Sequence, residues 1–222
     1  MKKSLLAVLL AVALVAPVFA TEKGDMEIVG KLGLNLTPNV AASGDVSKKG
    51  YFKPYDFKNT DADTNMSVLI GAEFFYYLNK NIALGFGINN NFNADLKGLD
   101  VDSRGERVKF ESEIGFTNFY FAVKPKIEMQ SEIFNSIYFV GQLGYGILRF
   151  DSDFFGEGKL SEADGNGLYW GIGAGTEIYK NFIVELLYSV NYGSIKTVMY
   201  MNGTADLTYT TLTLNVGYKF SI

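Results

Sequence analysis

NVGYKFSI, residues 215–222, decides the fold, because every second residue within it and just before it is apolar. Counting back from the last residue, the even positions carry Ile222, Phe220, Tyr218, Val216, Leu214 and Leu212. The odd positions are small or polar and carry Ser221, Lys219, Gly217, Asn215, Thr213 and Thr211. A two-residue period predicts a β-strand that has one apolar face.

The same alternation recurs along the chain and predicts an all-β protein. We expect eight strands, at about residues 26–37, 65–78, 82–94, 108–128, 136–150, 167–179, 182–192 and 205–222. In the stretch 108–128 the apolar positions change from even to odd near Thr117 and Asn118, which predicts a β-bulge at that point.

The connections between these strands alternate between short and long. Residues 79–81 and 180–181 are tight turns and 129–135 is a medium one, whereas 38–64, 96–107, 151–166 and 194–204 are long polar stretches. Short turns on one rim and long loops on the other are typical of an antiparallel up-and-down transmembrane β-barrel. The aromatic residues within 50–59 suggest that the neighbouring strands extend into a protruding hairpin, which either adheres to a surface or folds over the barrel mouth.

The strands of soluble carrier barrels also alternate apolar and polar residues, with the apolar face inward, so inward and outward orientations of this face must be compared. An eight-stranded interior holds only about 12 large side chains in layers. The apolar face of this sequence carries far more than that, with 18 Phe and 14 Tyr in the chain. The apolar face is therefore expected to point towards lipid, and the face rich in Gly, Asn, Ser and Thr towards the lumen.

Residues 1–20 are predicted to be a cleavable signal peptide, so that residues 21–222 form the barrel. Two lysines precede an apolar run that is too short to span a bilayer comfortably, and Pro17 and Ala20 stand before Thr21. The chain contains no Cys, so no disulfide stabilises the barrel. The segment therefore predicts that the barrel is secreted from the cytoplasm.

Composition excludes several other classes of function. The formal net charge is -4 without a basic tract, which argues against a nucleic-acid partner. No apolar run after the signal approaches the roughly 20 residues of a membrane helix. The chain has no His, the usual general base of hydrolytic barrels, so we expect no catalytic residues and no enzyme.

The C-terminal stretch resembles the insertion signal of bacterial outer-membrane barrels, through Asn215, Gly217, Phe220 and Ile222. It departs from the pattern by ending in Ile rather than the commoner Phe. The whole chain after the signal resembles the OmpA/OmpX-like small barrels of the porin family, the outer membrane protein beta-barrel domain. This resemblance implies that the barrel-assembly machinery reads the last strand during insertion.

The resemblance leaves the biochemical role open. It implies a structural, adhesive or envelope-integrity role, and the alternative is a narrow channel for small solutes or, as proposed for relatives of the OmpW type, small hydrophobic molecules. We expect a monomer in outer-membrane lipid, with the long loops available to a surface ligand.

The lumen-facing positions include ionisable residues that need partners. Counted from the short-turn rim, Lys31 and Glu73 lie at the same height on neighbouring strands, and so do Glu185 and Lys219. We therefore expect these two cross-strand ion pairs. Glu177 and Glu113 are expected nearby, completing the predicted polar network of the interior: Lys31, Glu73, Glu113, Glu177, Glu185 and Lys219. The network is either a gate or a charge network that only fills the core.

No cofactor or metal site is predicted. Asp151, Asp153, Gly156 and Glu162 have the spacing of a calcium loop, but Phe155 occupies a position that should carry an oxygen ligand.

Overall fold

The computed structural model describes residues 24–48, 55–64, 66–103, 106–152, 160–196 and 201–221. Within these ranges the strands are β1 (Met26–Asn35), β2 (Asn39–Lys48), β3 (Tyr55–Thr64), β4 (Ser67–Asn79), β5 (Ile82–Ser103), β6 (Glu106–Glu128), β7 (Phe134–Ser152), β8 (Leu160–Ile178), β9 (Phe182–Lys196) and β10 (Met201–Ser221). In the described part of the chain, no helix is long and apolar enough to cross a membrane. The predicted signal peptide at 1–20 falls outside these residues.

The ten strands fill eight positions around a closed barrel, because two positions are each shared by two strands. β1 pairs with residues 213–221 of β10, and β2 pairs with residues 201–210 of the same strand. In the next position, β4 pairs with β1 and β3 pairs with β2. Every ladder is antiparallel, and the sheet closes through β1–β10 and β5–β6. The predicted eight-stranded antiparallel barrel is confirmed.

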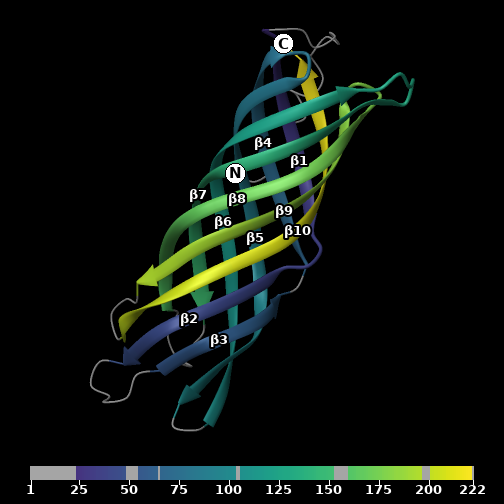
Figure 1. Cartoon of the computed structure of the whole chain (residues 1–222). Helices are drawn as coiled ribbons and strands as arrows, with labels where there is room; N and C mark the ends of the chain where they lie inside the picture. The colour runs from purple at the N-terminus through teal and green to yellow at the C-terminus, as the bar shows by residue number, and fades with distance from the viewer. Residues whose placement is uncertain are drawn as a thin grey trace, which may run out of the picture.

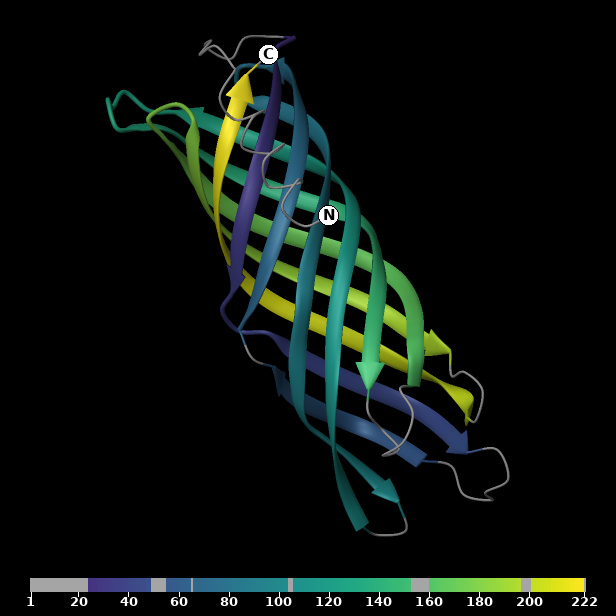
Figure 2. The same cartoon turned by 180° about the vertical axis from the view of Figure 1, so that it is seen from behind.

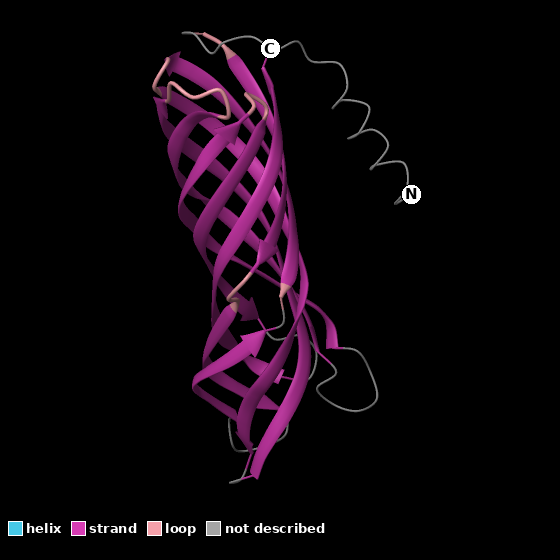
Figure 3. Cartoon of the chain, turned by 90° about the vertical axis from the view of Figure 1, so that its right-hand side faces the viewer, coloured by secondary structure: helices cyan, strands magenta, loops and turns pink. Residues whose placement is uncertain are grey.

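The barrel is a tall cylinder whose two ends differ (Figure 1). The C-terminus lies at the end with the short turns, called here the short-turn end, whereas β2 and β3 lie towards the opposite, long-loop end (Figure 1). Seen from behind, β1 and β10 run side by side and close the wall (Figure 2). Strands make up nearly all of the described chain, with loops and turns only at the ends and at breaks in the strands (Figure 3).

The strand position shared by β1 and β2 is interrupted at residues 36–38. Asn35 pairs with Thr213, but Asn39 pairs with Thr210, so the β1–β2 side carries one extra residue. The buried positions consequently change from odd in β1 to even at Pro38 and Val40. Pro38 cannot donate a backbone hydrogen bond to the ladder, which explains why the break falls there.

The large apolar side chains point outward, as predicted. Exposed examples from the eight wall positions are Leu32, Ile70, Phe86, Phe121, Leu143, Ile172, Leu186 and Leu214. The residues next to them in each strand are buried or half-buried, so that exposed and less exposed side chains alternate along the described strands. A continuous apolar outer surface of this kind suits hydrocarbon, in which an unclosed sheet edge would leave backbone groups unpaired.

The bulge expected near Thr117 and Asn118 is wrong. The β5–β6 ladder runs without a shift through Asn90↔Thr117 and Asn89↔Asn118, and the β6–β7 ladder is regular there too. Register shifts of the β5–β6 ladder fall instead between Asn91 and Ala94 and between Lys97 and Leu99, on the β5 side. From Ile114 to Lys126 the inward-facing positions of β6 are even, so its apolar residues Ile114 and Phe116 enter the lumen.

Much of what was expected to be long loop is strand. β5 continues to Ser103, β6 begins at Glu106, and β8 begins at Leu160. The stretch 38–64 contains the β2–β3 hairpin, although residues 49–54 lie outside the described ranges. Polar sequence does not end a strand when both neighbours supply hydrogen-bond partners, so the ladders continue past the apolar band.

Aromatic rings enter the lumen where a glycine on the facing strand leaves room. A Cβ added to Gly87 would lie 2.6 Å from the ring of Tyr120, and one added to Gly175 would lie 2.5 Å from the ring of Tyr138. The sequence suggested an interior lined only by glycines and small polar groups, but large aromatic rings also lie there. The inward rings are balanced by glycines rather than excluded.

Candidate functional site

The lumen is stratified along its axis, and two strands show the order from the long-loop end to the short-turn end. Inward positions of β10 are Leu207, Tyr209, Thr211, Thr213, Asn215, Gly217 and Lys219. Inward positions of β6 are Ile114, Phe116, Asn118, Tyr120, Ala122, Lys124 and Lys126. Both strands pass from apolar residues through amides or hydroxyls to lysine.

Four groups of buried side chains follow from this order. The basal cluster, nearest the short-turn end, consists of Glu27, Lys124, Lys126, Glu177 and Lys219. The central cluster above it consists of Lys31, Glu73 and Glu185. The amide layer consists of Asn35, Ser67, Asn89, Asn91, Asn118, Ser189, Asn191, Thr211 and Thr213. The apolar layer consists of Val40, Ile114, Phe116, Leu148, Leu207 and Tyr209.

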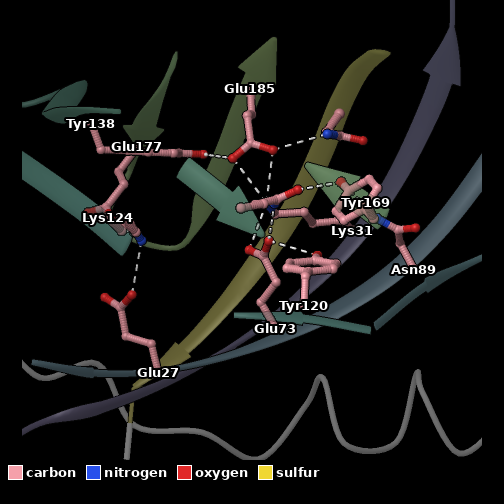
Figure 4. A network of polar contacts seen from close by, with 12 residues as sticks. Glu27, Lys31, Glu73, Asn89, Tyr120, Lys124, Tyr138, Tyr169, Glu177 and Glu185 are labelled. Atoms are coloured by element: carbon pink, nitrogen blue, oxygen red, sulfur yellow. Dashed lines mark hydrogen bonds and ion pairs between the residues drawn. The ribbon is translucent and has the colours of Figure 1, made fainter. Parts of the chain in front are cut away.

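The central cluster is organised around one lysine. The Nζ of Lys31 lies 2.7 Å from the Oε2 of Glu73 and 2.8 Å from the Oε1 of Glu185. Figure 4 shows Lys31 between these two carboxylates, which come from β4 and β9. One cation thereby ties three strands together inside the barrel.

Neutral side chains donate further hydrogen bonds to the two central carboxylates. Glu73 Oε1 accepts from the Tyr120 hydroxyl and from Gln142 Nε2, both at 2.9 Å. Glu185 accepts from the Tyr138 hydroxyl at 3.1 Å and from Asn215 Nδ2 at 3.0 Å. Buried carboxylates are tolerated only with such multiple partners.

The basal cluster is an ion-pair network of three lysines and two glutamates. Lys219 Nζ lies 3.0 Å from Glu27 and 2.9 Å from Glu177, and Lys124 Nζ lies 3.1 and 3.3 Å from the same two residues. Lys126 Nζ lies 3.8 Å from Glu177. With ordinary ionisation the basal cluster has one cation in excess, and the central cluster has one carboxylate in excess. Together they are neutral.

Tyr138 connects the two clusters. Its hydroxyl donates to Glu185 in the central cluster, and the ammonium of Lys124 in the basal cluster lies 4.8 Å from its ring centroid. The ring of Phe75 receives the same ammonium at 5.0 Å. Aromatic faces thus separate the charged clusters while still interacting favourably with the cation.

Two short turns hold basal lysines in place through the same arrangement. The carbonyl of Asn81 accepts from the backbone N–H of Lys126 at 2.7 Å, and its Nδ2 donates to the Lys126 carbonyl at 2.9 Å. Asn181 makes the equivalent pair of bonds with Lys219, again at 2.7 and 2.9 Å. The β4–β5 turn therefore fixes the backbone of a lysine on β6, and the β8–β9 turn fixes that of a lysine on β10.

Five of the six sequence-predicted interior residues are buried in the lumen: Lys31, Glu73, Glu177, Glu185 and Lys219. The pairing of Lys31 with Glu73 is present, but the expected pairing of Glu185 with Lys219 is wrong. The β9–β10 register places Glu185 opposite Asn215, whereas Lys219 lies closer to the rim, among the carboxylates of the basal cluster.

Glu113 does not belong to the interior network. Its side chain is exposed because even positions of β6 face inward, and the buried neighbour is Ile114. The expectation for Glu113 rested on the bulge that the structure lacks.

Sequence reasoning missed several members of the clusters, notably Glu27, Lys124 and Lys126. Lys124 and Lys126 alternate with Val123, Pro125 and Ile127, so their inward direction follows once the outward phase at 119–123 is extended. The inward direction of Tyr120, Tyr138 and Tyr169 could not be predicted from the sequence, for a different reason. They adjoin outward aromatic or apolar residues, and residue type alone does not show which of two neighbouring rings enters the lumen.

The C-terminal residues lie on both faces of β10. Asn215 is buried in the lumen and contacts Glu185, and Gly217 leaves room for Ile183. Phe220 shares the outward phase of Leu214, but it is only 8% exposed, and its ring packs against Tyr218 with centroids 4.7 Å apart. Ile222 falls outside the described residues, and a role of these residues in insertion stays a prediction.

Among the described residues, no group of three or more His, Cys, Asp or Glu could hold a metal ion. The calcium-loop spacing at 151–162 lies in residues whose side chains are not described.

The chain is similar to several solved structures, and the first of those named here, with a TM-score above 0.5, supports the fold. The outer membrane protein OprG from Pseudomonas aeruginosa matches with a TM-score of 0.54 and 15% identity, covering 93% of this chain and 99% of that one. Ail from Yersinia pestis, solved with the heparin analogue sucrose octasulfate, matches with a TM-score of 0.44 and 14% identity, covering 89% and 99%. The protease OmpT from Escherichia coli matches with a TM-score of 0.48 and 9% identity, covering 95% and 100%. At these identities the likeness concerns the fold alone.

No curated protein matches this sequence. The family model of the outer membrane protein beta-barrel domain matches residues 4–220, nearly the whole chain. The closed barrel, its apolar exterior and this match agree with one another, and the chain belongs to the outer membrane protein beta-barrel domain family of the bacterial outer membrane.

Proposed function

We propose that this protein is a plugged outer-membrane barrel with a structural or surface-interaction role in the envelope, and that it is not an open pore. The observation that carries the proposal is the central cluster, in which Lys31 joins Glu73 and Glu185 across the lumen. Tyr120, Tyr138 and Gln142 fill the space around these ion pairs. An aqueous path would have to break this buried network.

The chemistry of the interior supports a role without catalysis. The chain contains no His, and the buried carboxylates of both clusters are engaged by lysines. A Ser or Thr nucleophile needs a neighbouring base to activate it. Among the described hydrogen bonds, the Ser194 hydroxyl donates to Asp206, but both residues are exposed and no further group orients them.

Recording in planar lipid bilayers tests the plug directly. The wild-type barrel should show little steady conductance, and Leu143→Ala on the lipid-facing surface should behave in the same way. A steady ohmic conductance of the wild type would overturn the proposal. Glu73→Ala and Lys219→Ala then separate the two readings of the network: new conductance identifies a gate, and unchanged closed behaviour identifies a plug that only fills the core.

A second candidate function, passage of small apolar molecules, is favoured by the long-loop half of the lumen. There the buried side chains form the apolar layer, in which the rings of Phe116 and Tyr209 lie 5.1 Å apart. At the same height the ladder between neighbouring strands is interrupted. Within the described residues, the ladder to β5 has no pair between Leu69↔Asn91 of β4 and Thr64↔Leu96 of β3. An apolar molecule in this layer would have a short sideways path into the membrane.

Methyl NMR in lipid nanodiscs tests this second candidate. On titration with decanol, the buried methyls of Ile114 and Leu148 should shift along a saturating curve. The outward methyls of Leu143 serve as the control and should shift only in proportion to the added alcohol. Equal, unsaturable shifts at both sets would remove the candidate without affecting the plugged-barrel proposal.

A further inference from the structure

A continuous relay of buried hydrogen bonds leads from the central cluster into the amide layer. Gln142 Nε2 donates to Glu73 at 2.9 Å, and the Tyr169 hydroxyl donates to Gln142 Oε1 at 2.5 Å. Asn89 Nδ2 donates to the Tyr169 oxygen at 3.4 Å, and Asn118 Nδ2 donates to Asn89 Oδ1 at 2.8 Å. Figure 4 shows Glu73, Tyr169 and Asn89 in this part of the interior.

The direction of the relay is fixed at its charged end. Glu73 is ion-paired with Lys31 and its carboxylate only accepts hydrogen bonds, so the Nε2 of Gln142 must face it. Each following group then has its donor turned towards Glu73 and its acceptor turned away. The relay consequently ends on the Oδ1 of Asn118, a buried acceptor that has no donor among the described residues.

Asn191 lies beside this end and has both a donor and an acceptor without a hydrogen-bond partner among the described residues. Within the described residues, neither its Oδ1 nor its Nδ2 has a hydrogen-bond partner, and the side chain is fully buried. A Cβ added to Gly146 would lie 2.7 Å from the Oδ1 of Asn118 and 2.9 Å from the Oδ1 of Asn191. Two amide oxygens therefore converge over the same glycine with no donor between them.

Rotation of the Asn191 amide does not satisfy the site. If its Nδ2 turned towards Asn118, the Oδ1 of Asn191 would still be a buried acceptor without a donor. Unpaired buried amides are costly, and buried waters usually satisfy such groups with two to four hydrogen bonds. A cation would suit the two oxygens but would leave the Nδ2 of Asn191 without an acceptor. The occupant must both donate and accept.

We propose that a buried water molecule bridges Asn118 and Asn191 over Gly146 and ends the relay that begins at Glu73. The site lies inside the amide layer, with the apolar layer on one side and the central cluster on the other. The barrel interior thus holds a bound water between the apolar layer and the central cluster, and the missing side chain of Gly146 lets the two amide oxygens that hold it lie over its Cα. This inference goes beyond the plugged-barrel proposal and does not depend on it.

The test uses the full barrel in lipid nanodiscs, with ¹⁵N-labelled side-chain amides. Water-to-amide NOE and ROE spectra should show cross-peaks of a long-lived water at the Nδ2 protons of Asn191. The same protons should exchange slowly with D₂O, because the site is sealed. Absence of the water cross-peaks in the wild type would overturn the inference, as would a direct scalar coupling across an Asn191–Asn118 hydrogen bond.

Paired glycine variants in β7 locate the water. Gly146→Ala places a methyl group over the converging oxygens and should abolish the cross-peaks, whereas Gly141→Ala meets nothing within 4 Å and should retain them. If Gly146→Ala does not fold, Asn191→Leu replaces it, and the loss is then read at the Nδ2 protons of Asn118. Retention of the Asn118 cross-peaks in Asn191→Leu overturns the bridging position. Amide shifts that change when Na⁺ is replaced by Tl⁺ would show a cation instead of water.

Discussion

Lys31 and Glu73 form an ion pair at 2.7 Å although their backbones do not face each other in the ladder. The β1–β4 register places Lys31 opposite Gly71 and Glu73 opposite Val29, so the two side chains meet on the diagonal. Gly71 has no side chain to stand between them. The pair therefore depends on a long lysine side chain that reaches over a glycine into the lumen.

Replacing Lys31 by Met should strongly destabilise the barrel. Both Glu73 and Glu185 would lose their cation while remaining buried, and breaking a buried pair in this way costs about 3–5 kcal/mol. The free energy of unfolding by urea, measured in lipid vesicles, reports the loss. Adding Glu73→Gln and Glu185→Gln to Lys31→Met should restore most of it, since no buried charge is then unpaired. A loss below about 1 kcal/mol in the single variant, the value of an exposed pair, would contradict the burial argument.

The fold could be predicted from alternation alone, because lipid on one side and a narrow lumen on the other impose opposite demands on successive residues. The same parity correctly places Lys31 and Glu73 inside. It does not give the stagger between strands, which decides that Glu185 meets Lys31 while Lys219 meets Glu27 and Glu177. Height along the axis depends on register, and register is a property of pairs of strands.

A second kind of error came from treating every apolar residue as lipid-facing. Ile114 and Phe116 are apolar and yet buried in the lumen, since they belong to the apolar layer. When Ile114 and Phe116 are assumed to face the lipid, the sequence predicts a bulge in β6 and an inward-facing Glu113. Where a barrel interior contains its own apolar layer, residue polarity no longer identifies the face, and only unbroken alternation does.

The contact between Gly87 and Tyr120 predicts a steric penalty. In Gly87→Ala the new methyl group would meet the Tyr120 ring at 2.6 Å, and forcing extra volume into a packed interior costs about 1–3 kcal/mol. Gly141→Ala is the matched control, because a Cβ there meets nothing within 4 Å. Urea unfolding of the two variants should differ by that amount. Equal stabilities would mean that the ring moves away freely.

The outer surface should show a penalty for charge that depends on depth. Phe121 is 77% exposed and lies between the outward-facing Phe119 and Val123 of β6, so its replacement by Arg should cost about 2–4 kcal/mol, as expected at the bilayer midplane. Met129, beyond the end of β6 at the short-turn rim, should lose only about 0–1 kcal/mol with the same replacement. Refolding into vesicles and urea titration measure both. Equal penalties at the two sites would contradict the placement of the apolar band.

Replacing the turn lysine by glycine should have opposite effects on stability in the β8–β9 turn and in the β4–β5 turn. Tyr179 and Lys180 have φ angles of 48° and 66°, and no other non-glycine residue in the described ranges has a positive φ. A side chain in this left-handed region costs about 1–2 kcal/mol, whereas glycine adds roughly 0.5–1 kcal/mol of backbone entropy loss on folding. Lys180→Gly should therefore raise the free energy of unfolding by about 0.5–1 kcal/mol.

Lys80 in the β4–β5 turn provides the control, since its φ is not positive. Lys80→Gly gains no relief of strain and should lower the free energy of unfolding by about 0.5–1 kcal/mol. In both turns the next residue is an asparagine that hydrogen-bonds to a lysine backbone, Asn81 to β6 and Asn181 to β10, so the two sites have similar surroundings. Thermal or urea unfolding of the two single variants, measured in the same detergent, gives the signs. If both substitutions shift stability in the same direction, the left-handed backbone at Lys180 is not the source of the effect.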